Sequence, residues 1–207
     1  FGPGAWGIMK IDGNTGEKIY DLTITEDSTI YDQNSTGIIS FVYGNTPVII
    51  GNQDRYTGGW PIDDSYPVFT KLNQMGDVLL KRRIGGFYPF ESEVRDIKNY
   101  QHEVITLSQL GASIQIQKLD TLLQEQWTMR IDRPGIIYAD QMKIDSSYIY
   151  ITGHAKDSLN TPPYHENETS SIHFFKFSLS TGDLIDNDSI DFNQNHVKPI
   201  EIELLDS

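Results

Sequence analysis

The chain has no cysteine, little positive charge and no long apolar run. Without cysteine there is no disulfide framework, no thiol nucleophile and no thiolate metal site. Lys and Arg number 16 against 29 Asp and Glu, and the resulting net charge of −13 would repel nucleic acid or an anionic membrane. No apolar stretch approaches the roughly 20 residues that span a bilayer, so we expect no direct insertion into a membrane.

The motifs of common catalytic and cofactor sites are also missing. The chain contains no Gly-X-Ser-X-Gly, no Gly-X-Gly-X-X-Gly and no His-Glu-X-X-His. Residues Asp12 to Gly16 have the spacing that begins a calcium loop, but the twelfth position is Thr23 instead of an acid, which favours a tight turn. We therefore expect no catalytic residue, no metal site and no cofactor.

What the chain does have is a short pattern that occurs four times. An apolar residue stands two before a Lys, another follows it, and then comes Asp, Asn or Ser. The four lysines are Lys10, Lys71, Lys118 and Lys176. Each copy continues through a turn to an acidic residue and a second apolar run. Strand–turn–strand units recurring at intervals of roughly 50–60 residues indicate a repeat architecture, in which the lysines are expected to be architectural.

A second pair of β-like runs lies between consecutive copies of this pattern. These runs are rich in β-branched and aromatic residues and are bounded by Gly, Asn, Asp and Ser, as is typical of hairpins. No segment shows helical periodicity, so we expect one all-β domain over residues 1–207. The expected parts of its four-stranded units are residues 6–24, 38–84, 93–131, 138–191 and 199–204.

Four-stranded units of this length, stacked radially, are the blades of a β-propeller. The first part supplies two strands and the last supplies one, so the sequence predicts about three and a half to four blades. This favours a segment of a longer propeller, and the alternative is a four-bladed ring with one unrecognised strand. The chain begins at Phe1 without a signal-peptide pattern, as expected of a processed or truncated piece.

The hairpins resemble pyrroloquinoline-quinone-type (PQQ-like) propeller repeats. Residues 10–20 and 176–184 contain the Thr-Gly turn of that family, and Trp127 stands at its aromatic position in the third copy. The second and third copies lack the Thr-Gly pair. The resemblance is to the blades of large secreted and cell-surface proteins, so it implies a propeller in that location and does not imply a quinone site.

Two long insertions, residues 53–64 and 156–167, stand at the same place in different units and would emerge on one face of a propeller. Long loops on a rigid scaffold often bind partners, and aromatic side chains suit contacts with sugars or proteins. The predicted binding residues of this face are Tyr56, Trp60, Tyr88, Tyr164 and His165. The alternative is that Trp60 and Tyr164 fold back to cover the edges of the sheets.

Three Asn-X-Ser/Thr triplets indicate a glycoprotein at the cell surface or outside the cell. Their asparagines are Asn34, Asn167 and Asn187. The predicted function is a non-catalytic module that binds a protein or glycan partner, or that assembles with further copies or with the rest of its own chain. The alternative is a propeller enzyme, a quinone-dependent dehydrogenase or a glycan hydrolase, with its active site on the insertion face. The polar residues of the innermost runs are Ser40, Asp96, Asp140 and Lys143.

Overall fold

The computed structural model of the protein describes residues 5–25, 38–43, 46–55, 64–83, 92–110, 113–132, 136–156, 170–192 and 203. These residues form fourteen β-strands and no helix, so the prediction of an all-β chain is confirmed. The described part accordingly contains no helix able to cross a membrane. The last predicted part, residues 199–204, lies outside the described residues except for Glu203.

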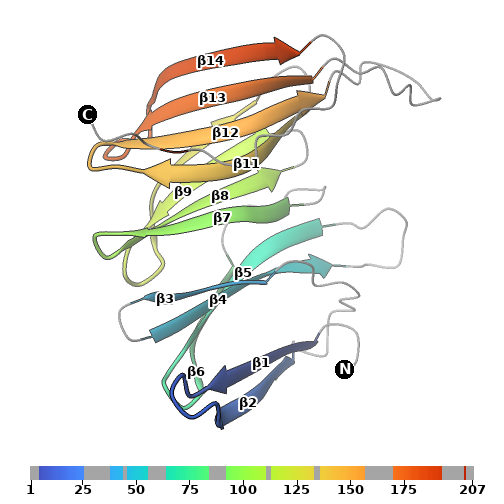
Figure 1. Cartoon of the computed structure of the whole chain (residues 1–207), viewed down its shortest axis with the longest axis vertical. Coiled ribbons are helices and arrows are strands. Elements are labelled where there is room, and N and C mark those ends of the chain that lie inside the picture. Colours follow the sequence, from blue (N-terminus) through green and yellow to red (C-terminus); the bar gives the residue numbers. More distant parts are fainter. Residues whose placement is uncertain are drawn as a thin grey trace, which may run out of the picture. The chain divides into compact units, whose positions relative to one another are not determined.

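The chain divides into two compact units, residues 1–94 and 95–207, with the division inside one strand. The first unit holds a two-stranded sheet, β1–β2, and a four-stranded sheet in the order β3-β4-β5-β6 (Figure 1). Their pairs are antiparallel. The strands are β1 (Ala5–Ile11), β2 (Lys18–Thr25), β3 (Ile38–Tyr43), β4 (Thr46–Arg55), β5 (Asp64–Leu72) and β6 (Val78–Arg83).

The second unit holds two four-stranded antiparallel sheets, β7 to β10 and β11 to β14, each in chain order. The first of their strands, β7, begins just before the division between the units. The strands are β7 (Ser92–Tyr100), β8 (Glu103–Leu110), β9 (Ser113–Leu119), β10 (Glu125–Ile131), β11 (Ile136–Ile144), β12 (Tyr148–Lys156), β13 (Ser170–Ser178) and β14 (Leu184–Phe192). The four sheets occupy the four larger segments predicted from the repeat.

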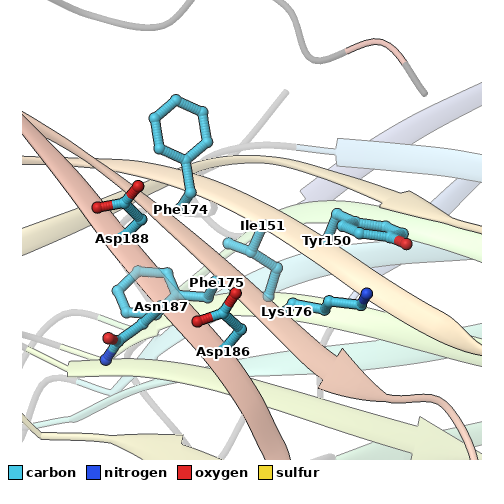
Figure 2. A pocket seen from close by; sticks show the side chains of 8 residues that line it. All are labelled: Tyr150, Ile151, Phe174, Phe175, Lys176, Asp186, Asn187 and Asp188. Carbon is cyan, nitrogen blue, oxygen red and sulfur yellow. The ribbon is translucent and has the colours of Figure 1, made fainter. Parts of the chain in front are cut away.

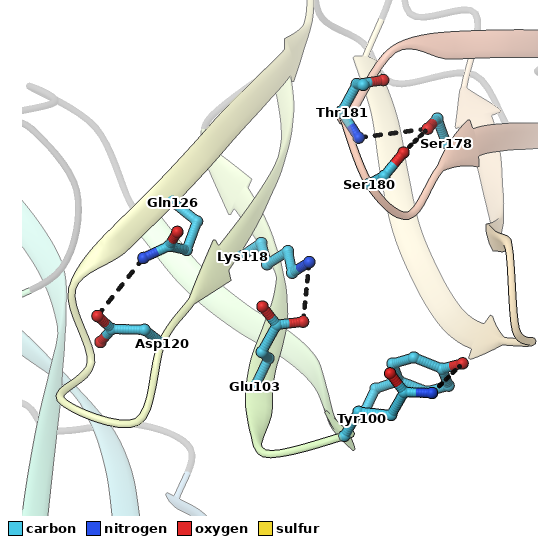
Figure 3. A network of polar contacts seen from close by, with 9 residues as sticks. Tyr100, Glu103, Lys118, Asp120, Gln126, Ser178, Ser180 and Thr181 are labelled. Atoms are coloured by element: carbon cyan, nitrogen blue, oxygen red, sulfur yellow. Dashed lines mark hydrogen bonds and ion pairs between the residues drawn. The ribbon is translucent and has the colours of Figure 1, made fainter.

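The residue after the apolar position of each repeat closes the turn of its hairpin. In the first copy Oδ1 of Asp12 accepts the backbone N–H groups of Asn14 and Thr15, at 2.8 and 2.9 Å. In the fourth copy Oγ of Ser178 accepts the N–H of Thr181 at 3.3 Å and lies 3.0 Å from Oγ of Ser180 (Figure 3). Short polar side chains that bond to their own backbone are the usual stabilisers of such turns.

The two middle copies use the same device. Oδ1 of Asn73 accepts from the N–H of Met75 and of Asp77, each at 2.8 Å. Asp120 does the same for the two residues at the corresponding places in its turn, again at 2.8 Å. The pattern Asp, Asn or Ser after the lysine therefore encodes turn closure, and Asp12 serves its turn in this way as the tight-turn interpretation of its segment requires.

The core of the second unit lies between its two sheets. Its buried members come from β8 and β9 on one side and from β11, β12 and the β13–β14 hairpin on the other: Ile105, Leu107, Ile114, Ile116, Ala139, Met142, Ile149, Ile151, Phe175, Phe177 and Leu179. Trp127 and Met129 of β10 pack against this cluster. Side chains of the first sheet also satisfy edge N–H groups of β11, since Oε1 of Gln109 accepts from Ala139 at 2.9 Å.

Candidate functional site

The residues predicted to bind a partner on the insertion face lie outside the described part of the chain. They are Tyr56, Trp60, Tyr88, Tyr164 and His165. Two sequon asparagines, Asn34 and Asn167, also lie outside it, whereas Asn187 is exposed on β14. The binding and glycosylation assignments therefore stay predictions, and the described residues offer a candidate site at the turns of the repeat instead.

Two turns of the repeat lie directly against an aromatic ring of the preceding hairpin of the repeat. In the first unit, a Cβ added to Gly76 would lie 3.2 Å from Cδ2 of Tyr20. In the second unit, a Cβ added to Gly182 would lie 2.7 Å from Cε3 of Trp127. Both glycines have positive φ, 94° and 79°. The absence of a side chain therefore permits both the turn conformation and the close approach to the ring.

Tyr20 and Trp127 occupy the same place in the repeat. Tyr20 is the cross-strand partner of Lys10, and Trp127 is that of Lys118. We call the four cross-strand partners of the repeat lysines the seat residues: Tyr20, Leu80, Trp127 and Asp186. Each of the four turns that follow a repeat lysine contains one positive-φ residue, and we call these the tip residues: Gly16, Gly76, Leu123 and Gly182.

One tip residue and one seat residue are exposed, whereas the others are buried or half-buried. Gly76, Leu123 and Gly182 are buried, whereas Gly16 is exposed. The seat residues Tyr20, Leu80 and Trp127 are half-buried, whereas Asp186 is exposed. One tip and one seat of the repeat are thus uncovered among the described residues.

The repeat lysines take part in the same contacts. Nζ of Lys10 lies 3.4 Å from the backbone oxygen of Gln74, in the turn that contacts Tyr20, and 5.9 Å from the centre of the Tyr20 ring. Nζ of Lys118 instead pairs with Oε2 of Glu103 at 2.8 Å (Figure 3). The expectation that these lysines are architectural agrees with both contacts.

A hollow of about 190 Å³ lies beside the exposed seat residue, Asp186 (Figure 2). The strand register puts Tyr150, Lys176 and Asp186 in one row across β12, β13 and β14, and puts Phe174 and Asp188 on the same face two residues along. All the lining residues are Tyr150, Ile151, Phe174, Phe175, Lys176, Asp186, Asn187 and Asp188. Phe174 is 37% exposed, so one wall of the hollow is apolar and open to solvent.

Lys176 lies between two tyrosines at one end of this hollow. Its Nζ is 3.9 Å from the centre of the Tyr148 ring and 5.6 Å from that of Tyr150, distances at which a cation is attracted by the ring face. In Figure 2 the lysine side chain extends toward Tyr150. The hydroxyl of Tyr150 donates to Oδ2 of Asp145 at 2.9 Å.

These neighbours shift the pKa values of Asp145 and Tyr150 in opposite directions. Burial opposes ionisation of Asp145, but the N–H groups of Ser147 and Tyr148, the Tyr150 hydroxyl and the charge of Lys176 together hold the pKa of the carboxyl below its usual value. Burial, followed by the hydrogen bond to Asp145 and the charge of that carboxylate, raises the pKa of Tyr150. The end of the hollow is therefore a fixed acid–tyrosine–lysine network.

The described polar residues of the innermost strands are engaged in structural contacts. Asp96 accepts from the N–H of Met142 at 3.0 Å and pairs with Lys98 at 3.0 Å. Asp140 pairs with Nδ1 of His154 at 2.7 Å, with both side chains largely buried. Among the described residues no three His, Asp or Glu side chains are grouped so that they could hold a metal ion. The side chain of Ser40 lies outside what the structure describes.

The seat residues occupy equivalent positions in the four copies, but counting from the repeat lysines does not bring them into register. Trp127 is identifiable from the sequence as the aromatic of the third copy, but Tyr20, Leu80 and Asp186 are not. The offset from lysine to seat is ten residues in the first copy (20 − 10) and nine in the third (127 − 118), because the turns differ in length. Alignment on the second strand would have found the four positions.

These observations define an all-β chain with a repeated hairpin. Within each unit, the turn of one hairpin packs on the seat residue of the preceding hairpin, and we call this a turn-on-seat contact. No family model and no curated protein matches the sequence. Among solved structures, a chimera of apocarotenoid oxygenase (ACO) and RPE65 matches with 10% identity and a TM-score of 0.49, over 90% of this chain and 44% of that one. A mutant of the Synechocystis apocarotenoid oxygenase (ACO) matches with 10% identity and a TM-score of 0.48, over 87% and 44%.

A protein of unknown function from Bacteroides caccae matches with 11% identity and a TM-score of 0.41, over 91% of this chain and 70% of that one. The chain thus spans less than half the length of the oxygenase structures. All three TM-scores are below 0.5, so these likenesses do not assign a fold family or a function.

Proposed function

We propose that this chain is a non-catalytic structural module, built from propeller-type blades of the PQQ-like repeat class, that forms assemblies at the cell surface or outside the cell. The observation that carries the proposal is the turn-on-seat contact, which occurs once in each unit with the same parts of the repeat. The most regular feature of the sequence thus serves to join one hairpin to the next. A repeat used in this way builds a scaffold.

The chemistry of the described residues supports this function over an enzyme. A propeller enzyme would need polar groups from several innermost strands that converge on one point and are free to react. Instead, Asp96 bonds to backbone and to Lys98, and Asp140 bonds to His154. Such fully engaged carboxylates stabilise the sheets that carry them.

The partner and the location in this proposal rest on the sequence. The insertions around Tyr56, Trp60 and Tyr164 would contact a protein or glycan, and the three sequons support an extracellular chain. Mass spectrometry of the protein from its natural source tests the location. Glycan mass on Asn34, Asn167 or Asn187 would support it, and unmodified asparagines on a protein recovered from the cell interior would contradict it.

Sedimentation velocity of the 207-residue chain tests the assembly role. Between about 1 and 100 μM, the range that weak specific interfaces occupy, we expect the average mass to rise with concentration. A chain that stays a monomer over this range would contradict the role. Turnover of glycosides, or of alcohols with added pyrroloquinoline quinone, would contradict the non-catalytic part of the proposal, and an Asp140→Asn variant would then show whether that carboxylate takes part.

A further inference from the structure

The hollow beside Asp186 is bounded by three neighbouring strands, β12, β13 and β14. Its volume of about 190 Å³ is below the range of roughly 300–1,000 Å³ that is typical of small-molecule sites. A hollow of this size accommodates one long side chain or one small organic group. Its lining combines carboxylates with aromatic rings, which constrains both the charge and the shape of the group that it can hold (Figure 2).

Two carboxylates line the side of the hollow that β14 forms. Asp186 and Asp188 stand on the same face of this strand, about 7 Å apart along it. Among the described residues Asp186 takes part in no hydrogen bond or ion pair. Asp188 accepts only the N–H of its neighbour Ser189 within the described part, at 2.7 Å from Oδ1. This side of the hollow therefore carries negative charge that no described cation pairs with.

Lys176 is the cross-strand partner of Asp186, but its ammonium group lies on the far side of β13. Nζ is 3.9 Å from the centre of the Tyr148 ring, which belongs to β12, and 5.6 Å from that of Tyr150. Figure 2 shows the lysine side chain extending toward Tyr150. Its charge is thus engaged by the acid–tyrosine–lysine network at one end of the hollow, and the β14 side stays acidic.

An exposed aromatic ring adjoins the acidic side. Phe174 is the cross-strand partner of Asp188 and is 37% exposed. The face of such a ring attracts a cation whose charge lies within about 6 Å of its centre. Ile151 and Phe175 also line the hollow, so its remaining surface is largely apolar. The lining therefore suits a flat cation on an apolar stem.

We propose that this hollow binds an arginine side chain of a protein partner. The guanidinium group is planar and weakly hydrated, donates to carboxylates through several N–H groups and stacks on aromatic rings, which matches Asp186, Asp188 and Phe174. The net charge of −13 also attracts a basic partner. This site is separate from the insertion face, and it does not depend on the self-association proposed above.

Two other occupants fit the lining less well. A lysine ammonium is a compact, strongly hydrated charge that makes neither the forked hydrogen bonds nor the flat stack of a guanidinium. A neutral sugar would stack on Phe174, but it would cover Asp186 and Asp188 without neutralising them. Covering an unpaired carboxylate is costly, so the charge of the hollow favours the cation.

NMR titration of the ¹⁵N-labelled 207-residue chain with short peptides tests the site. The probe is acetyl-Gly-Gly-Arg-Gly-Gly-amide, and matched probes carry lysine or citrulline, the neutral isostere of arginine, in place of the arginine. We expect the arginine peptide to shift the backbone signals around Phe174 and Asp186 with a Kd on the order of 1 mM, as a single side chain in a shallow site gives. The citrulline peptide is expected to bind at least about tenfold more weakly, since it cannot neutralise the carboxylates.

A lysine or citrulline peptide that binds as tightly as the arginine peptide would overturn the proposal. Glucose that shifts the same signals, when the arginine peptide does not, would assign the hollow to a sugar and would also overturn it. Free arginine is the third comparison, because Asp186 and Asp188 repel its α-carboxylate. Tighter binding of free arginine than of the peptide would replace the protein partner by the amino acid.

Three variants locate the binding in the hollow. Asp186→Asn is expected to weaken the arginine peptide by about tenfold, which corresponds to 1.4 kcal/mol. The matched control is Asp191→Asn, which removes the same charge from the opposite face of β14 and is expected to have an effect below about twofold. Phe174→Leu keeps an apolar side chain without the ring and is expected to weaken binding by about threefold.

Equal weakening by Asp186→Asn and Asp191→Asn would show that only the overall charge attracts the peptide, and would overturn the site. Native affinity in Phe174→Leu would overturn the stacking that selects arginine. All three positions are exposed, so the substitutions leave the core in place, and the NMR spectrum of each free variant checks its fold. Sedimentation of the native chain is a separate measurement, so failure of the assembly role and failure of this site are distinguishable.

Discussion

Gly182 lies against the indole of Trp127 so closely that a single added methyl group would come within 2.7 Å of the ring. The two residues belong to consecutive copies of the repeat and to different sheets of the second unit. Their contact couples a turn conformation that glycine favours to the packing of an aromatic side chain. The conformation of this one turn therefore affects the stability of the whole unit.

Replacing Gly182 with alanine is expected to destabilise the second unit by more than the cost of its backbone strain. At φ 79° that strain is on the order of 1 kcal/mol, and the clash with Trp127 adds about 1–3 kcal/mol. Gly16→Ala is the matched control, because φ is 72° there and the site is open. Chemical denaturation of dilute samples measures both, and equal losses would show that the ring adjusts at no cost.

Trp127 can be tested from the other side of the same contact. The indole N–H is buried with no hydrogen-bond partner among the described residues, so Trp127→Phe removes an unsatisfied donor and keeps most of the apolar surface. We expect that change to be nearly neutral. Trp127→Ala leaves the turn unsupported and is expected to cost about 2–4 kcal/mol in the free energy of unfolding. A similar loss in both variants would mean that the indole N–H matters more than the ring.

The strands and turns could be predicted from the sequence, because alternating apolar runs and Asp, Asn or Ser at turn entry are local signals. The contacts between hairpins could not. The seat at Tyr20 can be identified only with the register of β1 and β2, and the hollow beside Asp186 only with the register of β12, β13 and β14. The prediction of propeller blades needs the placement of whole sheets relative to one another, which no local pattern fixes.

Leu123 is a further case that local reasoning missed. The third turn has no glycine, and its tip is a leucine at φ 57° that is only 2% exposed. A non-glycine residue in this conformation costs about 1–2 kcal/mol, and the buried side chain offsets that cost. The turn thus keeps its shape because burial of the Leu123 side chain compensates for the strain of the backbone.

The balance between backbone strain and side-chain burial predicts an unusual order of stabilities among variants at position 123. Leu123→Gly loses the buried side chain but relieves the backbone, whereas Leu123→Ala loses most of the side chain and keeps the strain. We expect both variants to be less stable than the native chain, with the glycine variant about 1 kcal/mol more stable than the alanine variant. Thermal unfolding of the three proteins measures the order, and an alanine variant above the glycine variant would contradict it.

Asp145 is expected to make part of the stability dependent on pH. Its pKa is lowered in the folded chain, so the carboxylate stabilises the fold above the unfolded-state pKa of about 3.9 and loses that effect as the pH falls through the lower folded-state value. Asp145→Asn keeps an acceptor for the turn but removes the attraction to Lys176. The difference in melting temperature between native and variant should therefore be greatest above about pH 5 and vanish in stronger acid.

The size of this difference is at most about 1 kcal/mol, because solvent screens a carboxylate at the surface. The comparison with the variant is needed because Asp12 and Asp132 also have lowered pKa values, mainly through hydrogen bonds from Thr15 and Ser113, and both lose stabilisation in acid with the same sign. Melting curves of the two proteins between about pH 2 and pH 7 separate these contributions. A difference that stays constant over that range would show that Asp145 acts through the shape of the turn alone, without a contribution from its charge beside Lys176 and Tyr150.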